Sequence, residues 1–209
     1  MTNKEQPTRV KELDALRGIA ALLVVFFHFT MYRPQANYGF KLGTTGIDLF
    51  FIISGFVILM SLTKIKSSAD YAINRISRLY PAYWAAVTFT FIMILLSPYL
   101  EVFFAQPASL DEYLGNMTMF QFYLQIPNLD GPYWTLIIEM NFYIGMFLLF
   151  HFKKLPLINA IGITLSLLSV IMTSFFYDLF VVKWVFTRIP LLQYVPLFFA
   201  GTVFYKVYS

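Results

Sequence analysis

Cysteine is absent from this chain of 209 residues. Its absence excludes disulfide bonds, thiolate metal sites and a cysteine nucleophile. Charged residues are also scarce, at 12% of the chain, whereas an average soluble domain has about 25%. A chain with so few charges does not fit a soluble domain.

What the chain has instead is apolar sequence, with 59% hydrophobic residues and a net charge of +4. An excess of basic over acidic residues can indicate nucleic-acid binding. Here the lysines and arginines lie beside long apolar stretches, so the positive-inside rule for membrane proteins explains them better. We therefore predict membrane lipid as a partner and no nucleic acid.

Six apolar stretches are long enough to cross a bilayer as helices. The expected fold is an all-α, polytopic transmembrane helical bundle, with the first stretch retained as a membrane helix. A basic helix over residues 71–79 is expected to lie flat at the interface until Pro81 breaks it. A short helix is expected over 109–123, and 178–188 is expected to be a short mixed connection. The predicted spans are residues 12–32, 45–63, 82–98, 133–152, 155–177 and 190–208.

The charged connections predict the orientation of the bundle. Basic clusters precede the first span and lie between the second and third spans and between the fourth and fifth spans. The long loop over residues 99–132 is acidic and has no lysine or arginine. The positive-inside rule then places the N-terminus in the cytoplasm and the 99–132 loop outside.

Arg17 and His28 bracket an apolar stretch of the first span. On a helix, eleven positions span about 16 Å and return to within roughly 20° of the starting direction. Arg17, Ala21, Val24 and His28 should therefore share one stripe, which would line an internal passage because ionisable groups are costly in lipid. The alternative is that Arg17 only sets topology and His28 only packs against another helix.

Two carboxylates are expected at the depth of His28 in the outer half of the bundle. Glu139 lies about 9 Å below the start of the fourth span, and His28 lies about 6 Å below the end of the first. A carboxylate beside a histidine fixes the imidazole tautomer and stabilises its protonated form. Asp48 is a competing partner, and a structural polar cluster is the alternative.

Arg75 and Arg78 are three residues apart, so on a helix they are expected to point the same way. Guanidinium groups held in this manner suit phosphate groups. The alternative is that they contact the headgroups of anionic lipids.

Four segments together resemble the N-terminal part of the membrane-bound acyltransferase-3 family: LRGIAALLVVFFH, GIDLFFIISGFVI, INRISRLYPAYW and YWTLIIEMNFY. They occur in the order, and on the spans, that the family has. The family's arginine-and-histidine pattern falls on Arg17 and His28, and its RxxR pattern falls on Arg75 and Arg78. Its Trp-to-Phe-Tyr pattern contains Glu139.

The resemblance implies transfer of an acyl group across the membrane. Cytoplasmic acyl-CoA, most often acetyl-CoA, would place its phosphates near Arg75 and Arg78 and its pantetheine arm along the Arg17–His28 stripe. His28 would act as general base on a hydroxyl of an extracytoplasmic carbohydrate or glycosylated acceptor. Glu139 or Asp48 would orient His28, and no metal is expected. We expect a multi-pass protein of a bacterial inner or plasma membrane.

The chain is shorter than the family members that it resembles, which usually have about ten membrane helices. We expect residues 1–209 to be a single integral-membrane domain that is incomplete at its C-terminus. Two alternatives stay open: a transporter-like protein, because ionisable residues inside the membrane also mark transport pathways, and a catalytically inactive membrane subunit.

Overall fold

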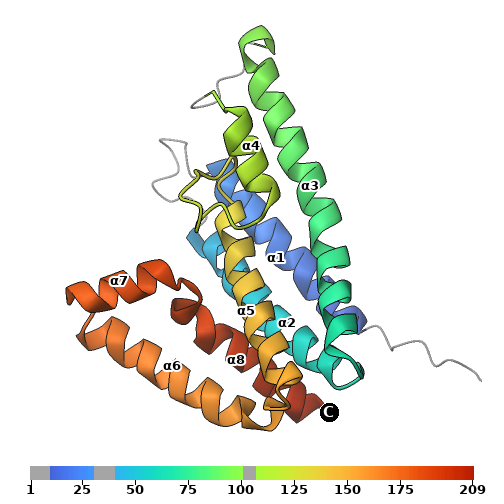
Figure 1. Ribbon diagram of the computed structural model, residues 1–209, viewed down its shortest axis with the longest axis vertical. Helices are drawn as coiled ribbons and strands as arrows, with labels where there is room; N and C mark the ends of the chain where they lie inside the picture. The colour runs from blue at the N-terminus through green and yellow to red at the C-terminus, as the bar shows by residue number, and fades with distance from the viewer. Residues whose placement is uncertain (1–9, 31–40, 101–106) are drawn as a thin grey trace, which may run out of the picture.

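The computed structural model describes residues 10–30, 41–100 and 107–209, and within them it is helical and without strands (Figure 1). Predictions that fall on residues 1–9, 31–40 and 101–106 lie outside the described residues. Short 3-10 turns over Lys41–Thr44 and Leu155–Leu157 precede the second and sixth helices. The helices are α1 (Lys11–Thr30), α2 (Thr45–Leu62), α3 (Ser68–Leu100), α4 (Leu110–Met117), α5 (Tyr133–His151), α6 (Ile158–Phe175), α7 (Phe180–Arg188) and α8 (Leu191–Tyr208).

Five segments of the described chain are long and apolar enough to cross a membrane. They confirm the predicted all-α, polytopic bundle. The sixth predicted span, 190–208, is helical as α8 but is not among these five segments. Its polar residues, Gln193 and Lys206 among them, lower its hydrophobicity. The five segments are Lys11–Thr30, Leu42–Leu62, Ser68–Tyr99, Tyr133–His151 and Leu155–Phe175.

The predicted break at Pro81 is wrong, because α3 is a single helix of 33 residues that contains this proline. Proline removes one helical hydrogen bond and usually kinks or ends a helix. Here Tyr80, Tyr83 and Trp84 donate hydrogen bonds to backbone carbonyls at the end of α4, over 3.0, 2.8 and 2.9 Å. These tertiary contacts hold the helix on both sides of the proline, so the basic segment continues directly into the membrane span.

Two connections also differ from expectation. The predicted helix over 109–123 is α4, which is shorter and begins with a capping box between Ser109 and Glu112. It ends at Met117, and Met119 has a φ of 65° that turns the chain away. The sequence predicts a mixed connection over 178–188, but most of this stretch forms α7. Short helices of this kind depend on tertiary packing, which local sequence does not reveal.

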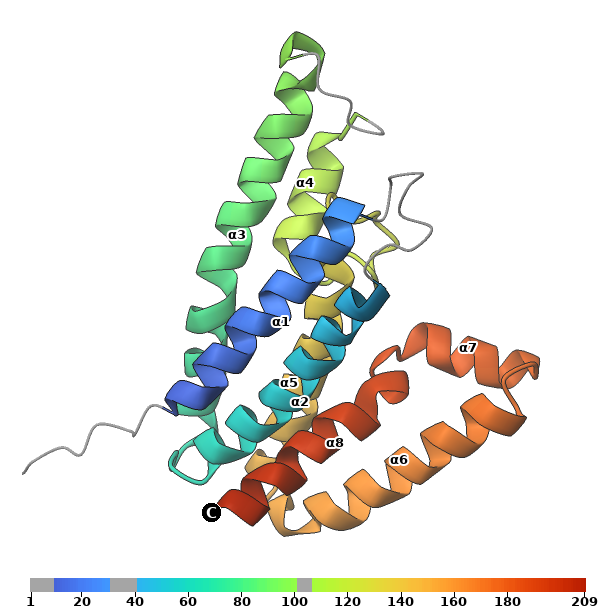
Figure 2. The ribbon, with the colours of Figure 1, turned by 180° about the vertical axis from the view of Figure 1, so that it is seen from behind.

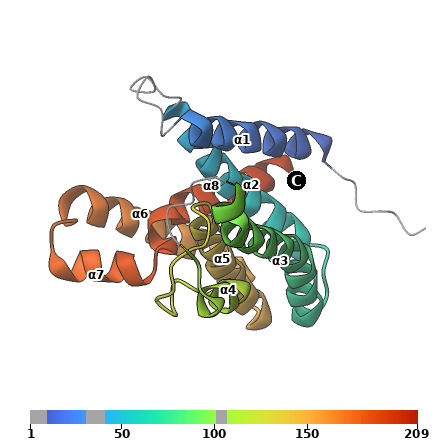
Figure 3. The same cartoon turned by 90° about the horizontal axis from the view of Figure 1, so that it is seen from above.

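The centre of the bundle is the contact between α2 and α8, where two glycines allow the helix backbones to touch. A Cβ on Gly55 would collide with the carbonyl of Phe198, and one on Gly201 would collide with the carbonyl of Ile52. Small residues that allow such close approach are typical of membrane helix pairs. Figure 2 shows α1 lying along α2, and Figure 3 shows α6 and α7 projecting from another side of the bundle.

Candidate active site

The inward face of α1 differs slightly from the predicted stripe. Arg17, Val24 and His28 are partly buried, as expected for that face, but Ala21 is exposed and Ala20 is fully buried. The carbonyl of Ala20 lies close to Gly46 of α2. Contact between two helices recurs every three or four residues, so the packing seam passes through Ala20 and leaves Ala21 outside.

His28 has a defined ring orientation. Its Nδ1 lies 2.8 Å from the backbone carbonyl oxygen of Val24, one helical turn earlier. A carbonyl oxygen only accepts hydrogen bonds, so Nδ1 is the donor. In the neutral imidazole the other nitrogen, Nε2, then carries the lone pair and can accept a proton.

His28 and Glu139 line the same cavity, which has a volume of about 250 Å³. Three helices, α1, α2 and α5, supply the walls, and most of them are apolar. Among the described residues, Asp48 is not part of the lining, and it lies instead within electrostatic range of Tyr194 on α8. The cavity therefore brings together two of the three predicted catalytic residues. Its lining is Val24, His28, Ile47, Phe50, Phe51, Pro132, Trp134, Thr135, Leu136 and Glu139.

Glu139 is held by two hydroxyl groups, those of Ser54 in the segment GIDLFFIISGFVI and of Tyr143 at the end of YWTLIIEMNFY, for which the sequence alone predicted no contact. Ser54 Oγ of α2 donates to Glu139 Oε1 over 2.7 Å, and the Tyr143 hydroxyl donates to the same oxygen. Charge-assisted bonds of this kind fix a carboxylate firmly. The available signals were a serine inside an otherwise apolar span and a tyrosine one turn after Glu139. Their pairing depends on how α2 packs against α5.

Arg75 is a buried cation, with 8% of its surface exposed. Its Nη2 donates to Ser61 Oγ over 2.8 Å, and its guanidinium lies 5.6 Å from the Tyr71 ring centre and 5.8 Å from that of Tyr143. Within the described chain its buried Nε has no hydrogen-bond partner, and no carboxylate forms an ion pair with it. A buried cation without a counter-ion is costly, and an anionic ligand would compensate it.

Arg78 does not share the environment of Arg75, because it is exposed. Three residues along a helix correspond to directions about 60° apart, which here is enough to separate a buried position from an exposed one. Arg17 pairs with Asp14 over 3.3 Å and lies within electrostatic range of Arg78 and Glu139. The three predicted donor-site arginines thus come from two helices, α1 and α3, and differ in burial.

Tyr143 connects the cavity with Arg75. Its hydroxyl bonds to Glu139 in one direction, and its ring faces the Arg75 guanidinium in the other. The Tyr71 hydroxyl donates to the Tyr143 carbonyl over 3.3 Å. The described residues contain no cluster of three or more histidine, aspartate or glutamate side chains that could hold a metal ion. The arrangement therefore joins a proton acceptor, a fixed carboxylate and a buried cation.

Comparison with known proteins gives a consistent result. The family described as "Acyltransferase domain" matches residues 10–209. A putative acetyltransferase of Acidianus two-tailed virus is 26% identical over 93% of this chain and 57% of its own length. A putative peptidoglycan O-acetyltransferase of Bacillus subtilis is 29% identical over 85% of this chain and 30% of its own. The peptidoglycan O-acetyltransferase of Listeria monocytogenes is 29% identical over 80% and 29%.

The chain thus spans just over half of the viral relative and under a third of the two bacterial ones. No solved structure is significantly similar to it. The family match covers nearly the whole chain, including every candidate site residue. The chain therefore belongs to the acyltransferase-3 family.

Proposed function

We propose that this protein moves an acyl group, most often acetyl, from cytoplasmic acyl-CoA to a hydroxyl group of an extracytoplasmic carbohydrate. One observation carries the proposal: His28 and Glu139 share a cavity, and the hydrogen bond from His28 Nδ1 leaves Nε2 as the proton acceptor. The names of two relatives, peptidoglycan O-acetyltransferases, support a hydroxyl acceptor on a cell-wall carbohydrate.

The proposed reaction is a direct transfer at the cavity. His28 Nε2 takes the proton from the acceptor hydroxyl as its oxygen attacks the thioester carbonyl carbon. The carbon–sulfur bond then breaks, and the leaving thiolate takes the proton back from the imidazolium. Glu139 stabilises the transient imidazolium through its negative charge, while Ser54 and Tyr143 keep the carboxylate in place.

The arginines are proposed to hold the donor. Arg75 is buried without a counter-ion among the described residues, and Arg17 and Arg78 lie within electrostatic range of each other. Phosphate groups would relieve both the uncompensated charge and the repulsion. Arg17 and His28 are about 16 Å apart along α1, a length comparable to an extended pantetheine arm. The donor would then enter at the cytoplasmic end and present its thioester to the outer cavity.

Glu139 is a better candidate than Asp48 for the carboxylate that acts with His28. Glu139 lines the cavity, whereas Asp48 is not among the described residues that do. We therefore assign Asp48 a weaker, indirect influence. Replacing Asp48 with Asn should reduce turnover less than replacing Glu139 with Gln does.

Substitution of His28 tests the proposal. In the full-length protein, His28→Gln should lower acyl transfer by about 10²–10⁴-fold, because glutamine keeps a hydrogen bond but cannot take up the proton. Binding of acyl-CoA should stay nearly unchanged, because His28 is remote from the proposed phosphate contacts. Transfer of radiolabelled acetyl groups, normalised to the amount of folded protein, measures the first effect, and calorimetry measures the second.

The outcomes separate the proposed enzyme from the other classes. Near-normal transfer by His28→Gln would contradict the general-base role and leave the histidine as a packing residue. Ion or proton flux that does not depend on acyl-CoA would identify a transporter. Binding of acyl-CoA without turnover in the unmodified full-length protein would identify an inactive subunit.

A further inference from the structure

A second, larger cleft lies between α7 and the loop that joins α4 to α5. Its volume is about 460 Å³, within the range of about 300–1,000 Å³ that is usual for small-molecule sites. It is separate from the His28 cavity, since the two linings have no described residue in common. The lining consists of Phe122, Tyr123, Gln125, Phe180, Lys183, Trp184, Thr187 and Arg188.

One face of α7 forms the first wall. The five lining residues of α7 lie at positions i, i+3, i+4, i+7 and i+8 of the helix, so they share a single face. Val182 and Phe186 are buried on the other side. Phe180 and Trp184 remain 80% and 53% exposed. Helix α7 therefore packs with one side and presents aromatic and basic groups with the other.

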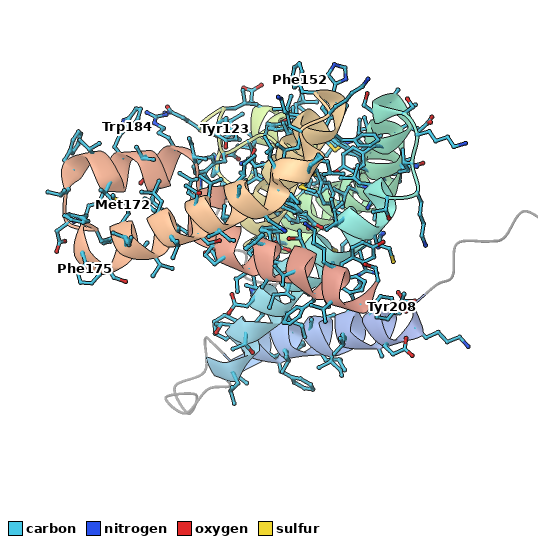
Figure 4. The ribbon with its side chains drawn as sticks, turned by 90° about the horizontal axis from the view of Figure 1, so that it is seen from below. Tyr123, Phe152, Met172, Phe175, Trp184 and Tyr208 are labelled. Atoms are coloured by element: carbon cyan, nitrogen blue, oxygen red, sulfur yellow. The ribbon has the colours of Figure 1, made fainter. Side chains whose placement is uncertain are left out.

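The loop before α5 forms the second wall and is tied to the catalytic helix. The Tyr123 hydroxyl accepts a hydrogen bond from Asn141 Nδ2 over 2.7 Å, and Asn141 is two residues beyond Glu139 on α5. Gln125 has a φ of 57°, which turns the chain at this wall. Figure 4 labels Tyr123 and Trp184 on these two neighbouring parts of the molecule. The cleft is thus built from the segments that lead into α5 and α8.

The chemistry of the lining selects a class of ligand. Four aromatic rings offer flat apolar surfaces, while Gln125 and Thr187 offer hydrogen bonds. The described lining also contains Lys183 and Arg188 but no carboxylate. Lys183 pairs with Asp178 over 3.1 Å, but this pair is on the surface, where such pairs are weak. Rings for stacking, hydroxyl partners and two cations together suit a sugar ring that carries a negative charge.

We propose that this cleft binds the carbohydrate acceptor and that the acceptor bears a carboxylate. The inference rests on the proposed function, because it names the substrate class for that reaction. The rings of Trp184 and Tyr123 stack on the sugar, and Arg188 forms a charge-assisted hydrogen bond with its carboxylate. Binding here holds the acceptor against α7 and the loop that leads into α5.

A membrane-surface helix is the competing explanation for α7, because aromatic and basic side chains also gather at bilayer interfaces. Such a helix presents its exposed face to lipid headgroups. The exposed face of α7 is instead opposed by Phe122, Tyr123 and Gln125 across the cleft. Two walls that face each other favour an enclosed ligand over a membrane surface.

The test measures binding in the absence of acyl donor. Full-length protein in lipid nanodiscs is titrated with trigalacturonate and with a disaccharide that contains muramic acid, each against its neutral, carboxyl-reduced counterpart. At least one acidic probe should bind, and its neutral counterpart should bind at least about tenfold more weakly. Trp184→Ala and Arg188→Gln should each weaken the acidic probe by about tenfold or more.

Phe175→Ala is the matched control, because Phe175 is an aromatic residue of α6 that is 79% exposed and lies outside the cleft lining. Its affinity should equal that of the unmodified protein. Failure of both acidic probes to bind, or unchanged affinity in both cleft variants, would overturn the proposal. Poor membrane retention of Trp184→Ala with unchanged sugar affinity would also overturn it and identify an interfacial anchor.

The binding assay keeps the two proposals distinguishable. Sugar binding that depends on Trp184 and Arg188 in a protein that transfers no acyl group would leave the cleft assignment intact and contradict the proposed reaction. Unchanged acyl transfer by both Trp184→Ala and Arg188→Gln would leave the proposed reaction intact and contradict the cleft assignment.

Discussion

At the scale of single residues, Arg75 is the side chain whose burial costs the protein the most free energy. Burial removes its guanidinium from water, and its contacts are one serine hydroxyl and two tyrosine rings. Cation–π contacts offset only part of the cost of burying a charge. The buried charge of Arg75 therefore lowers the free energy of unfolding when no ligand is bound.

We expect Arg75→Met to separate stability from donor binding. The substitution keeps a long side chain and removes the buried charge, so the thermal unfolding temperature without ligand should be equal or higher. Acyl-CoA affinity should fall by about ten- to a hundredfold, the usual cost of a lost charge-assisted contact. Thermal unfolding in detergent and calorimetry measure the two effects.

Arg78→Met is the control that shows the effect of removing an exposed arginine from the same helix. Arg78 lies on the surface, so its loss should leave the unfolding temperature unchanged while weakening donor binding. A large drop in the unfolding temperature of Arg75→Met, with acyl-CoA affinity retained, would show that Arg75 serves the packing of α2, α3 and α5 instead of the donor.

At the scale of helices, the α2–α8 contact positions the site. Helix α2 supplies Ser54 to Glu139 and also lines the His28 cavity, so any shift of α8 against α2 reaches the site. The contact depends on Gly55 and Gly201, whose missing side chains let the backbones meet. The two helices cannot separate without displacing Ser54, which holds the Glu139 carboxylate.

Gly201→Ala should therefore destabilise the protein. The new methyl group would meet the carbonyl of Ile52, which is backbone and cannot move aside, and overpacking of this kind costs about 1–3 kcal/mol. Gly145→Ala is the matched control, because no atom of the described chain outside its own helical backbone lies within 4 Å of the position that its methyl group would take. That change should be neutral or stabilising by up to about 1 kcal/mol, since alanine favours a helix more than glycine.

Thermal unfolding of the two glycine variants in the same detergent compares them directly. Equal unfolding temperatures would mean that α2 and α8 do not meet at Gly201. A lower unfolding temperature for Gly201→Ala together with weaker acyl transfer would support the link between this contact and the site.

At the scale of the whole molecule, the arrangement depends on which end faces the cytoplasm. The basic segment lies at the start of α3, whereas α4, at the head of the acidic connection, packs beside the middle of α3 (Figure 1), where Tyr80, Tyr83 and Trp84 bond to its end. With the N-terminus inside, both the His28 cavity and the α7 cleft face outward, and the start of α3 faces the donor. The proposed reaction requires this orientation.

Single-cysteine labelling tests the orientation cleanly, because the chain has no cysteine of its own. Leu124 and Lys66 are exposed and belong to the two connections, whereas the Ser109 and Ser67 side chains make local hydrogen bonds. An impermeant maleimide should label Leu124→Cys in intact cells and Lys66→Cys only after the membrane is opened. The reverse pattern would invert the topology and contradict the proposed direction of transfer.

Several features follow from local sequence and so could be predicted without a structure. Apolar length predicted six spans, because a helix that crosses a bilayer must be long and apolar, and the structure supports five of them by length and composition. Spacing along α1 placed Arg17 and His28 on the protein-facing side, since helical periodicity is independent of the neighbouring helix. Similar depth also identified Glu139 as a neighbour of His28, and the two residues do line one cavity.

Other features were decided only when the helices packed. The continuity of α3 through Pro81 depends on hydrogen bonds from Tyr80, Tyr83 and Trp84 to a segment more than thirty residues away. The burial of Arg75 and the exposure of Arg78 depend on where α2 and α5 meet α3. Local sequence specifies which ionisable groups each helix carries and at which positions along the helix they lie. Tertiary structure decided which of them meet, because contacts between helices depend on side-chain fit that periodicity does not encode.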